Sequence, residues 1–265
     1  MAAAISTPTY NPLSALYADG IDKSFGGSKV LDGAWIDVPE KKIVGLIGPN
    51  GAGKSTFLTV LSKFAEPDAG RIISRVEDVT HLSPEALARA GVVRTFQVPR
   101  EFSELSVLDN MIIAAKDQIG ESAWKAIVFP KRVAAQNRAI TGRARELLDF
   151  LGLSAVSANA AKNLSGGQKK LLELGRALMT DPFLLLLDEP FAGVAPGLVD
   201  VLIEKLRQLN ERGIGLLIVE HNMEAINALC GHVYVMMRGA ILTDGSPKHV
   251  GSDPRVLEAY LGGAA

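Results

Sequence analysis

The segment from Gly48 to Ser55 constrains the fold of this chain more than any other part of the sequence. It reads Gly-Pro-Asn-Gly-Ala-Gly-Lys-Ser and fits the spacing G-x-x-x-x-G-K-[ST]. An apolar run typical of a buried parallel strand, Lys42 to Gly48, precedes it, and a helix is expected from about Gly53 to Ser62. Its glycines let consecutive backbone N–H groups approach a phosphate closely, and the helix start adds a positive dipole end. The sequence therefore predicts a phosphate-binding loop between a strand and a helix.

Two side chains of this phosphate loop (Gly48–Ser55) have the chemistry to hold a nucleoside triphosphate. We expect the ammonium of Lys54 to reach the β- and γ-phosphates, and the hydroxyl of Ser55 to bind Mg²⁺. The residues expected to contact the nucleotide here are Gly48, Pro49, Asn50, Gly51, Ala52, Gly53, Lys54, Ser55 and Thr56. Phosphate binding alone does not distinguish between kinases, GTPases and ATPases.

A pair of carboxylates narrows these alternatives. A second buried strand is predicted from Phe183 to Leu187, and it runs directly into Asp188 and Glu189. Because side chains alternate along a strand, we expect the two carboxylates to point to opposite sides. Asp188 is then the candidate ligand of Mg²⁺, and Glu189 is the candidate base that orients an attacking water.

A third motif, Leu164-Ser-Gly-Gly-Gln168, opens a predicted helix before that strand. Ser165 is a typical N-cap residue, and Gly166 and Gly167 leave backbone N–H groups free at the helix start. The motif therefore predicts a second anion site on the same chain. One nucleotide cannot use two phosphate-binding helix starts that lie far apart in one subunit.

Together, the three motifs resemble those of the ATP-binding-cassette ATPases, and the resemblance covers residues 14–263. It implies an α/β fold of the P-loop NTPase type, with a RecA-like mixed sheet core, an antiparallel β-subdomain and a helical subdomain. It also implies that two cassettes dimerise head to tail, so that the signature loop of one (Ser165, Gly166, Gly167 and Gln168) closes on the ATP held by the other. The cofactors implied are ATP and Mg²⁺.

Further positions resemble functional residues of that family. Phe25 lies where relatives place an aromatic ring that stacks on adenine, and Gln97 resembles the glutamine that contacts Mg²⁺ and the water. His221 resembles the switch histidine that reaches the γ-phosphate, so the expected catalytic set is Glu189, His221 and Gln97. Ala195 departs from the pattern, because relatives usually carry Asp or Asn there to help couple the two sites across the dimer.

The predicted organisation follows the distribution of strands along the chain. Residues 1–13 are expected to form a polar tail, and the strand-rich blocks 14–97 and 183–245 a single nucleotide-binding core with the β-subdomain. Residues 98–182 are expected to form the helical subdomain with the signature loop, and residues 246–263 a helical tail. The first strands, within Ser14–Val38, are expected to pair as an antiparallel hairpin around Gly26-Gly27.

Composition limits the partners. A formal net charge of −1 argues against a protein held on nucleic acid by bulk charge, and the single cysteine, Cys230, excludes an intrachain disulfide framework. No apolar run is long enough to span a bilayer, and Met1 to Thr9 lacks the basic start of a secretory signal. The expected location is cytoplasmic, peripheral on the inner face of the cell membrane, where the subunit must borrow a pore from transmembrane permease subunits.

Two segments resemble one class of importer cassettes in particular. The stretch Arg94 to Asn110, with the long helical insertion after it, and the ending Asp253 to Gly262 look like the cassettes for branched-chain amino acids, and also like those serving urea and short amides. In those bacterial importers a second cassette subunit, two permeases and a periplasmic solute-binding protein are the partners. The lipopolysaccharide-export cassette is the alternative transporter, which Glu189 to Val194 also suits, but the insertion Asp117 to Ile140 is too long for it.

Other classes of ATPase fit the chain less well. DNA-repair and chromosome-organising cassettes need a long coiled-coil insertion, and translation factors carry two cassettes in one chain. A plain P-loop kinase would need an acceptor pocket and a lid, and it leaves Ser165–Gln168 and His221 unexplained. The sequence does not reveal the transported solute, because the permease and the solute-binding protein select it.

Overall fold

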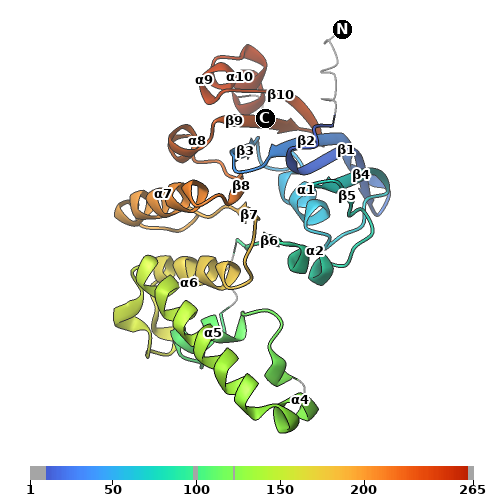
Figure 1. Cartoon of the computed structure of the whole chain (residues 1–265). Coiled ribbons are helices and arrows are strands. Elements are labelled where there is room, and N and C mark those ends of the chain that lie inside the picture. Colours follow the sequence, from blue (N-terminus) through green and yellow to red (C-terminus); the bar gives the residue numbers. More distant parts are fainter. Residues whose placement is uncertain (1–9, 98–100, 122, 262–265) are drawn as a thin grey trace. The chain divides into compact units, whose positions relative to one another are not determined.

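The computed structural model describes residues 10–97, 101–121 and 123–261 of the chain (Figure 1). They belong to two compact units. The described residues of the first unit are 10–97, 183–192 and 199–261, and those of the second are 101–121, 123–182 and 193–198. Because segments far apart in the sequence share one unit, the helical stretch is an insertion into the chain of the first.

A six-stranded sheet lies at the centre of the first unit. Its strands are β3 (Ile43–Ile47), β6 (Val92–Arg94), β7 (Leu184–Asp188), β8 (Gly215–Val219), β9 (His232–Met237) and β10 (Ala240–Gly245), in the order β10-β9-β3-β8-β7-β6. All neighbours pair in parallel except β9 and β10, which form an antiparallel hairpin. The sheet is therefore mixed, as predicted, and β3 from the first strand block pairs directly with β8 from the second.

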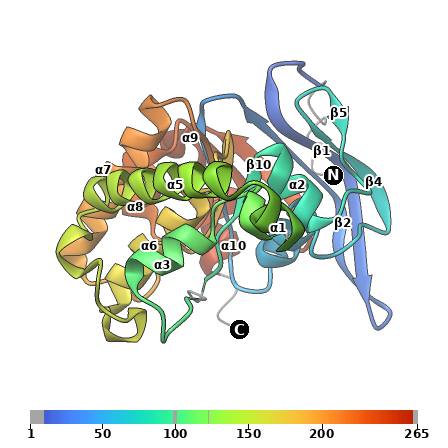
Figure 2. The same cartoon turned by 60° about the horizontal axis from the view of Figure 1, so that its bottom comes forward.

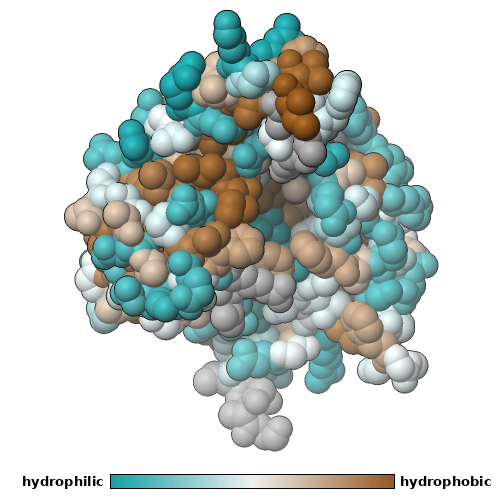
Figure 3. All heavy atoms as spheres, turned by 90° about the horizontal axis from the view of Figure 1, so that it is seen from below, coloured by the Kyte–Doolittle hydropathy of each residue, from teal (hydrophilic) through white to brown (hydrophobic). Residues whose placement is uncertain are grey.

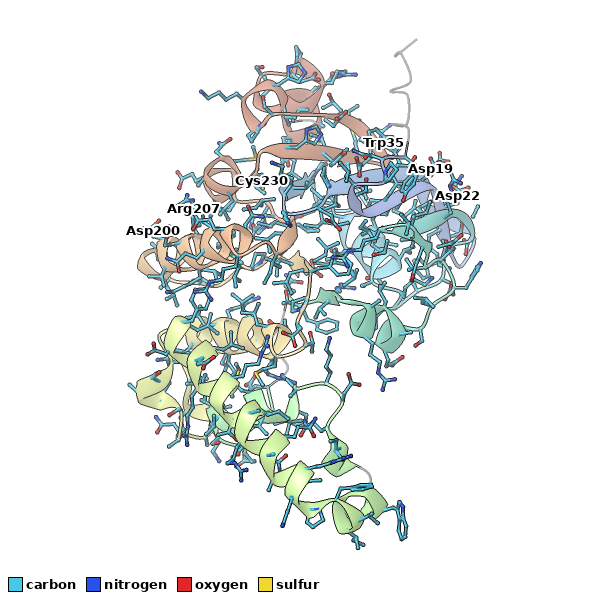
Figure 4. The ribbon with its side chains drawn as sticks, viewed as in Figure 1. Asp19, Asp22, Trp35, Asp200, Arg207 and Cys230 are labelled. Carbon is cyan, nitrogen blue, oxygen red and sulfur yellow. The ribbon has the colours of Figure 1, made fainter. Side chains whose placement is uncertain are left out.

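A smaller antiparallel sheet completes the strands of this unit. It consists of β1 (Ser14–Phe25), β2 (Ser28–Pro39), β4 (Ala69–Ser74) and β5 (Glu77–Asp78), in the order β2-β1-β4-β5. The predicted hairpin is confirmed, since β1 and β2 pair around Gly26-Gly27. One apolar cluster joins the two sheets: Trp35 of β2, labelled in Figure 4, packs edge to face on Tyr234 of β9 with ring centroids 5.3 Å apart.

The helices of the first unit include the predicted one after the phosphate loop and the predicted helical tail, whereas the helix from Met223 to Leu229 was not predicted. They are α1 (Lys54–Leu61), α2 (Pro84–Ala90), α8 (Met223–Leu229), α9 (Pro247–Gly251) and α10 (Pro254–Leu261), and α7 (Pro196–Glu211) has all but its first residues here. The side chains of Phe57, Leu58 and Leu61 on α1 are fully buried against both sheets. This packing fixes α1, and with it the end of the phosphate loop.

The second unit is helical, as the sequence predicts. It contains α3 (Val107–Ile113), α4 (Ala123–Val128), α5 (Pro130–Phe150), α6 (Gly166–Leu178) and the short 3₁₀ turns η1 (Ile119–Glu121), η2 (Ser154–Val156) and η3 (Ala161–Asn163). Helices α3, α5 and α6 lie side by side (Figure 2). The contact is close at Gly175, where an added Cβ would lie 2.8 Å from the sulfur of Met111.

The surface carries scattered apolar side chains. On the face seen in Figure 3, hydrophobic patches interrupt a largely hydrophilic surface. The most exposed large apolar residues include Trp124 and Ile127 of α4, at 72% and 75%. Across the described parts of the chain, no helix combines the length and the apolar character needed to cross a membrane.

Candidate functional site

The phosphate loop leaves the sheet at the carboxyl end of β3 and turns sharply into α1. Gly48 has φ 151°, and a Cβ there would overlap the carbonyl oxygen of Met236 on the neighbouring strand. Gly53 has φ 105° and caps the start of α1. These two glycines are required because the loop passes close to other backbone at one end and turns left-handed at the other.

Lys54 lies over the loop rather than in solvent. Its ammonium donates hydrogen bonds to the carbonyl oxygens of Gly48 at 2.7 Å and Pro49 at 2.9 Å. Burial lowers the pKa of Lys54, while the carboxylates of Glu189 and Asp188 raise it. A half-desolvated ammonium in this position gains from an anion at the loop, because phosphate oxygens are stronger acceptors than carbonyls.

Asp188 ends β7 and forms a buried ion pair that the sequence analysis did not anticipate. Its carboxylate accepts a hydrogen bond from the guanidinium of Arg94 at 2.8 Å, and both side chains are less than 10% exposed. Arg94 also donates to the hydroxyls of Thr59 and Ser62 on α1, each at 3.1 Å. Arg94 therefore links β6, β7 and α1, and its position in the sequence, three residues before Gln97, was the one signal for it.

Glu189 is brought together with the two other expected catalytic residues. Its carboxylate accepts a hydrogen bond from the amide of Gln97 at 2.7 Å, and Nδ1 of His221 lies 3.9 Å from its other oxygen. Asp188 and Glu189 have different partners. Alternation along the strand is not the reason, however: Glu189 follows the end of β7 with a left-handed backbone (φ 45°), and its N–H donates to Val219 at 2.9 Å.

Glu220 is a second residue that the sequence analysis missed. Its side chain is 1% exposed. One carboxylate oxygen accepts from the N–H of Phe191 at 2.9 Å, and the other accepts from the N–H groups of His221 at 2.9 Å and Asn222 at 3.1 Å. Glu220 therefore fastens the segment after β7 to the segment after β8, and both carry site residues. A carboxylate at the end of an apolar strand was the available signal.

Two open cavities adjoin these residues, both within the first unit. The smaller, about 210 Å³, is lined by Val30, Asn50, Gly51, Ala52, Gly53, Lys54, Ser55, Thr56 and Glu189. The larger, about 600 Å³ and called here the hydrolysis cavity, is lined by Gly48, Pro49, Asn50, Gln97, Glu189, His221 and Tyr260. Glu189 borders both cavities, so it adjoins the phosphate loop in one and Gln97 and His221 in the other.

Phe25 is the last residue of β1, next to the Gly26-Gly27 turn into β2. Its ring is 52% exposed, and the ammonium of Lys23 lies 5.5 Å from the ring centroid. An exposed aromatic face is what stacking on a planar base requires.

The signature loop lies in the second unit and begins α6. The hydroxyl of Ser165 accepts from the N–H of Gln168 at 3.3 Å, while the side chain of Gln168 accepts from the N–H of Ser165 at 3.0 Å. This is a capping box, which fixes the first turn. The two glycines differ: a Cβ on Gly166 meets nothing within 4 Å, whereas one on Gly167 would overlap Leu198. Gly167 therefore has a packing role whatever the loop binds.

The side chains expected to hold Mg²⁺ carry oxygen donors, the ligand type that this cation prefers. The exposed hydroxyl of Ser55 lines the smaller cavity, and the amide of Gln97 lines the hydrolysis cavity. The carboxylate of Asp188 lines neither cavity and is paired with Arg94, so its role as a ligand stays a prediction. Among the residues that the structure describes, no group of three or more His, Cys, Asp and Glu side chains forms a cation site by itself.

The fold and the site define a P-loop nucleotide-binding protein: a glycine loop and a lysine-bearing helix follow a buried strand, and a second strand of the same sheet ends in two carboxylates. The chain belongs to the ABC transporter family of ATP-binding cassettes. Residues 31–192 match the sequence profile of that family, and residues 240–265 match the profile of the branched-chain amino acid ATP-binding cassette transporters.

Individual relatives cover nearly the whole chain. One relative is the probable branched-chain amino acid transport ATP-binding protein LivG of Methanocaldococcus jannaschii, which is 39% identical over 254 residues. That alignment covers 94% of this chain and 98% of the relative. It is 35% identical over 252 residues to the high-affinity branched-chain amino acid transport ATP-binding protein BraF of Pseudomonas aeruginosa, with the same coverage of 94% and 98%.

A solved structure agrees with the fold. The crystal structure of a nucleotide-free ATP-binding cassette from an ABC transporter superimposes with a TM-score of 0.81 at 39% identity, covering 93% of this chain and 98% of that one. These comparisons confirm the family, the cassette fold and the ATPase class that the three motifs predict.

Proposed function

We propose that this protein is the ATP-hydrolysing subunit of an importer for branched-chain amino acids or related small solutes. The observation that carries the chemistry is the meeting of Gln97, Glu189 and His221 beside the phosphate loop. The solute class rests on the match of residues 240–265 and on the names of the relatives, because nothing in a nucleotide site selects a solute.

The residues of this site divide the work of hydrolysis. Backbone amides of the phosphate loop and the ammonium of Lys54 bind the β- and γ-phosphates, in a position where burial strengthens each contact. Ser55, Gln97 and Asp188 would hold Mg²⁺, which neutralises phosphate charge when it is bound with ATP.

The remaining groups of the site act on the attacking water and the γ-phosphate. Glu189 accepts from Gln97 and so has an oriented carboxylate, which makes it the group that orients the water. His221 lines the same cavity and is placed to contact the γ-phosphate. Its main-chain N–H donates to the carboxylate of Glu220, which fixes the position of the backbone that carries the imidazole ring.

The cassette acts with partners. We infer that ATP closes two cassettes head to tail, with Ser165, Gly166 and Gly167 of one copy capping the ATP of the other through the start of α6. The second cassette is a further copy or a different subunit. The permease subunits, with a solute-binding protein beyond them, place the protein on the cytoplasmic side of the cell membrane.

The test of the hydrolytic assignment is Glu189→Gln. The amide keeps the size of the side chain but does not act as a base, so turnover should fall about 10²- to 10⁴-fold while ATP affinity stays close to wild type. Glu211→Gln, an exposed carboxylate at the end of α7, is the matched control and should hydrolyse ATP normally. Normal turnover in Glu189→Gln would show that the base lies elsewhere.

Lys54→Ala tests nucleotide binding separately. Hydrogen bonds to charged groups contribute about 1.5–3 kcal/mol, so removing the ammonium should weaken Mg-ATP binding at least roughly tenfold in calorimetry. Lys42→Ala removes an exposed lysine just before β3 and should leave affinity unchanged. Affinity within a few-fold of wild type in Lys54→Ala would contradict the role of the loop.

The solute class is tested in proteoliposomes that contain the permease subunits encoded beside this chain. With ATP inside and the solute-binding protein outside, leucine uptake should exceed urea uptake. Uptake of urea but not leucine would move the protein to the related amide importers.

A further inference from the structure

The C-terminal helix supplies a residue to the wall of the hydrolysis cavity. Tyr260, on the last turn of α10, lines that cavity together with Gln97, Glu189 and His221. All four belong to the first unit. None of the three motifs predicts this contact, because α10 follows the nucleotide motifs in the sequence by many residues.

Helix α10 is held firmly enough to position a side chain. Val256 and Ala259 are buried, and Asp253 begins the helix. The guanidinium of Arg255 donates to the carboxylate of Asp253 at 2.7 Å and to the hydroxyl of Thr243 on β10 at 3.2 Å. These contacts fix the helix on the hairpin β9–β10.

The same helix also shares a third cavity with the phosphate loop. This cavity, about 640 Å³, is lined both by Pro49, Asn50, Gly51 and Ala52 of the loop and by Arg255, Glu258 and Ala259 of α10. The loop is therefore flanked by α10 along two cavities. Figure 1 shows α10 beside β10, at the end of the first unit's chain.

The hydroxyl of Tyr260 lies near the phosphate loop. Burial raises its pKa, and the backbone N–H of Gly48 opposes that shift. A phenol hydroxyl can both accept and donate, so it can accept from the loop while it donates toward the cavity.

We propose that Tyr260 is a positioning residue for ATP hydrolysis, which the C-terminal helix contributes to the hydrolysis cavity. Its ring lines the cavity together with Gln97 and Glu189, and its hydroxyl can accept a hydrogen bond from the N–H of Gly48, the first residue of the phosphate loop. The inference rests on the proposed function of that cavity. It gives the C-terminal segment, residues 240–265, a part in the chemistry of the cassette.

A residue that positions the loop and the water should affect turnover more than nucleotide binding. Most of the residues expected to bind ATP, from Asn50 to Thr56, border the smaller cavity, whose lining includes no residue of α10. A small misplacement of the reacting groups lowers a rate by up to about 10²-fold even when binding is intact. The expected signature is therefore a fall in kcat with little change in KM.

The experiment compares Tyr260→Ala, Tyr260→Phe and Leu257→Ala in the full-length protein. Leu257 is 51% exposed on the same helix and serves as the control for the loss of a large side chain. The measurements are kcat and KM for Mg-ATP, the affinity for ATP in calorimetry, and the thermal midpoint of each variant.

We expect Tyr260→Ala to lower kcat about 10- to 100-fold with KM within about threefold of wild type. Tyr260→Phe keeps the wall and loses the hydroxyl, so its kcat should lie between those of Tyr260→Ala and wild type. Leu257→Ala should match wild type. If Tyr260→Ala does not fold, Tyr260→Phe decides alone: lowered kcat at normal KM supports the role, and wild-type kinetics overturn it.

Parallel assays of Glu189→Gln separate the two possible failures. If Glu189→Gln is inactive while both Tyr260 variants hydrolyse ATP like Leu257→Ala, the role of Tyr260 is overturned and the proposed function stands. If Glu189→Gln hydrolyses ATP normally, the proposed function of the cavity fails, whatever the Tyr260 variants do. If the fall in kcat/KM of the Tyr260 variants comes entirely from a higher KM, with kcat unchanged, the positioning role is also overturned.

Discussion

Glu220 shows how one buried side chain organises a site without entering it. Its carboxylate accepts three backbone N–H groups from two segments, those that follow β7 and β8. Without this carboxylate the three N–H groups would lose their acceptor, and an unpaired buried N–H is costly. The spacing between Glu189 and His221 therefore depends on a residue that neither contacts ATP nor belongs to a motif.

Glu220→Ala should destabilise the protein and slow it. The hydrogen bond from Phe191 is buried, and those from His221 and Asn222 are partly buried. A buried amide left unpaired costs about 1–3 kcal/mol, so we expect a loss of about 2 kcal/mol of unfolding free energy. In a domain of this size that lowers the thermal midpoint by at least roughly 4 °C. Calorimetry checks the midpoint, and a phosphate-release assay checks turnover. Glu211→Ala is the control; equal midpoints for the two variants would contradict the structural role of Glu220.

The residues of the site fall into two groups by how far the sequence reveals them. Lys54 and Ser55 are fixed by a local spacing, so their roles could be stated before the fold was known. Arg94 donates to Asp188 and Glu220 accepts from Phe191, and in both pairs the partners are distant in the chain. Only the register of β6, β7 and β8 brings them together. Tyr260 is the extreme case, because its neighbours in the cavity lie in four other segments of the chain.

At the scale of elements, most boundaries followed from local patterns, and the sheet order did not. Helix α10 begins at the proline and ends at the leucine that the sequence indicates, and α1 starts at the residue after Gly53. The short strands β3, β7 and β8 are buried throughout, so each reads as the same apolar run. Nothing in such runs says which strand neighbours which, and the order had to come from the structure.

The turn between β9 and β10 supports the phosphate loop. The N–H of Gly239 donates to the carbonyl of Ala52 at 2.8 Å, and its carbonyl accepts from the N–H of Asp32 at 3.0 Å. Gly239 has φ 82°, and a Cβ there would overlap the carbonyl oxygen of Val30. This one turn therefore joins the hairpin, β2 and the loop.

Gly239→Ala should disturb all three together. The added methyl both clashes with backbone and strains a left-handed turn, so we expect a loss of about 1–3 kcal/mol of stability and weaker ATP binding. Gly231→Ala is the control, since a Cβ there meets nothing within 4 Å. Denaturant unfolding and calorimetry are the measurements. Unchanged nucleotide affinity in a clearly destabilised Gly239→Ala would show that the turn supports the fold but not the loop.

Helices α4 and α5 carry the strongest local charge pattern. Between Lys125 and Arg145 the sequence has six basic residues and no acidic one. The buried residues of α5 are Ala144 and Leu148, both in its last two turns. Trp124 and Ile127 at the start of this segment are exposed. This start is either a solvated helical face or, as the next experiment tests, a contact surface for the permease or the cytoplasmic leaflet.

Reversing charge at Arg132 and Arg138 tests this surface. Assembly with the permease subunits should fall in a pull-down, while ATP hydrolysis by the isolated subunit should stay at wild-type level, because both residues lie outside the nucleotide site. Reversal at Arg89 and Lys248, two exposed basic residues of the first unit, gives the same change in net charge and should leave assembly intact. An unchanged pull-down of the Arg132 and Arg138 variant would exclude this surface as the contact.

At the scale of the whole molecule, the two anion-binding helix starts belong to different units. The phosphate loop leads into α1 of the first unit, and the signature loop begins α6 of the second. Each unit has its own buried core, so the two sites are built independently. In the proposed head-to-tail dimer, a nucleotide shared by two copies would use one helix start from each, which would explain why a single chain carries both.

Trapping that shared state gives the last prediction. Glu189→Gln should bind ATP without turning it over, so the γ-phosphate stays in contact with Lys54 of one copy and the signature loop of the other. Light scattering should then show a shift from monomer to dimer when ATP is added, and ADP should not produce it. Adding Ser165→Arg should reverse the shift, because a long cationic side chain at the cap of α6 blocks the close approach of the helix start to phosphate. Ser252→Arg, at the end of α9, is the matched control and should leave the dimer intact. Where the physiological partner is a different cassette, the homodimer is weak, and the same measurement with that partner decides. If neither mixture dimerises with ATP, each copy must complete its site alone, and the signature loop then has no phosphate to bind.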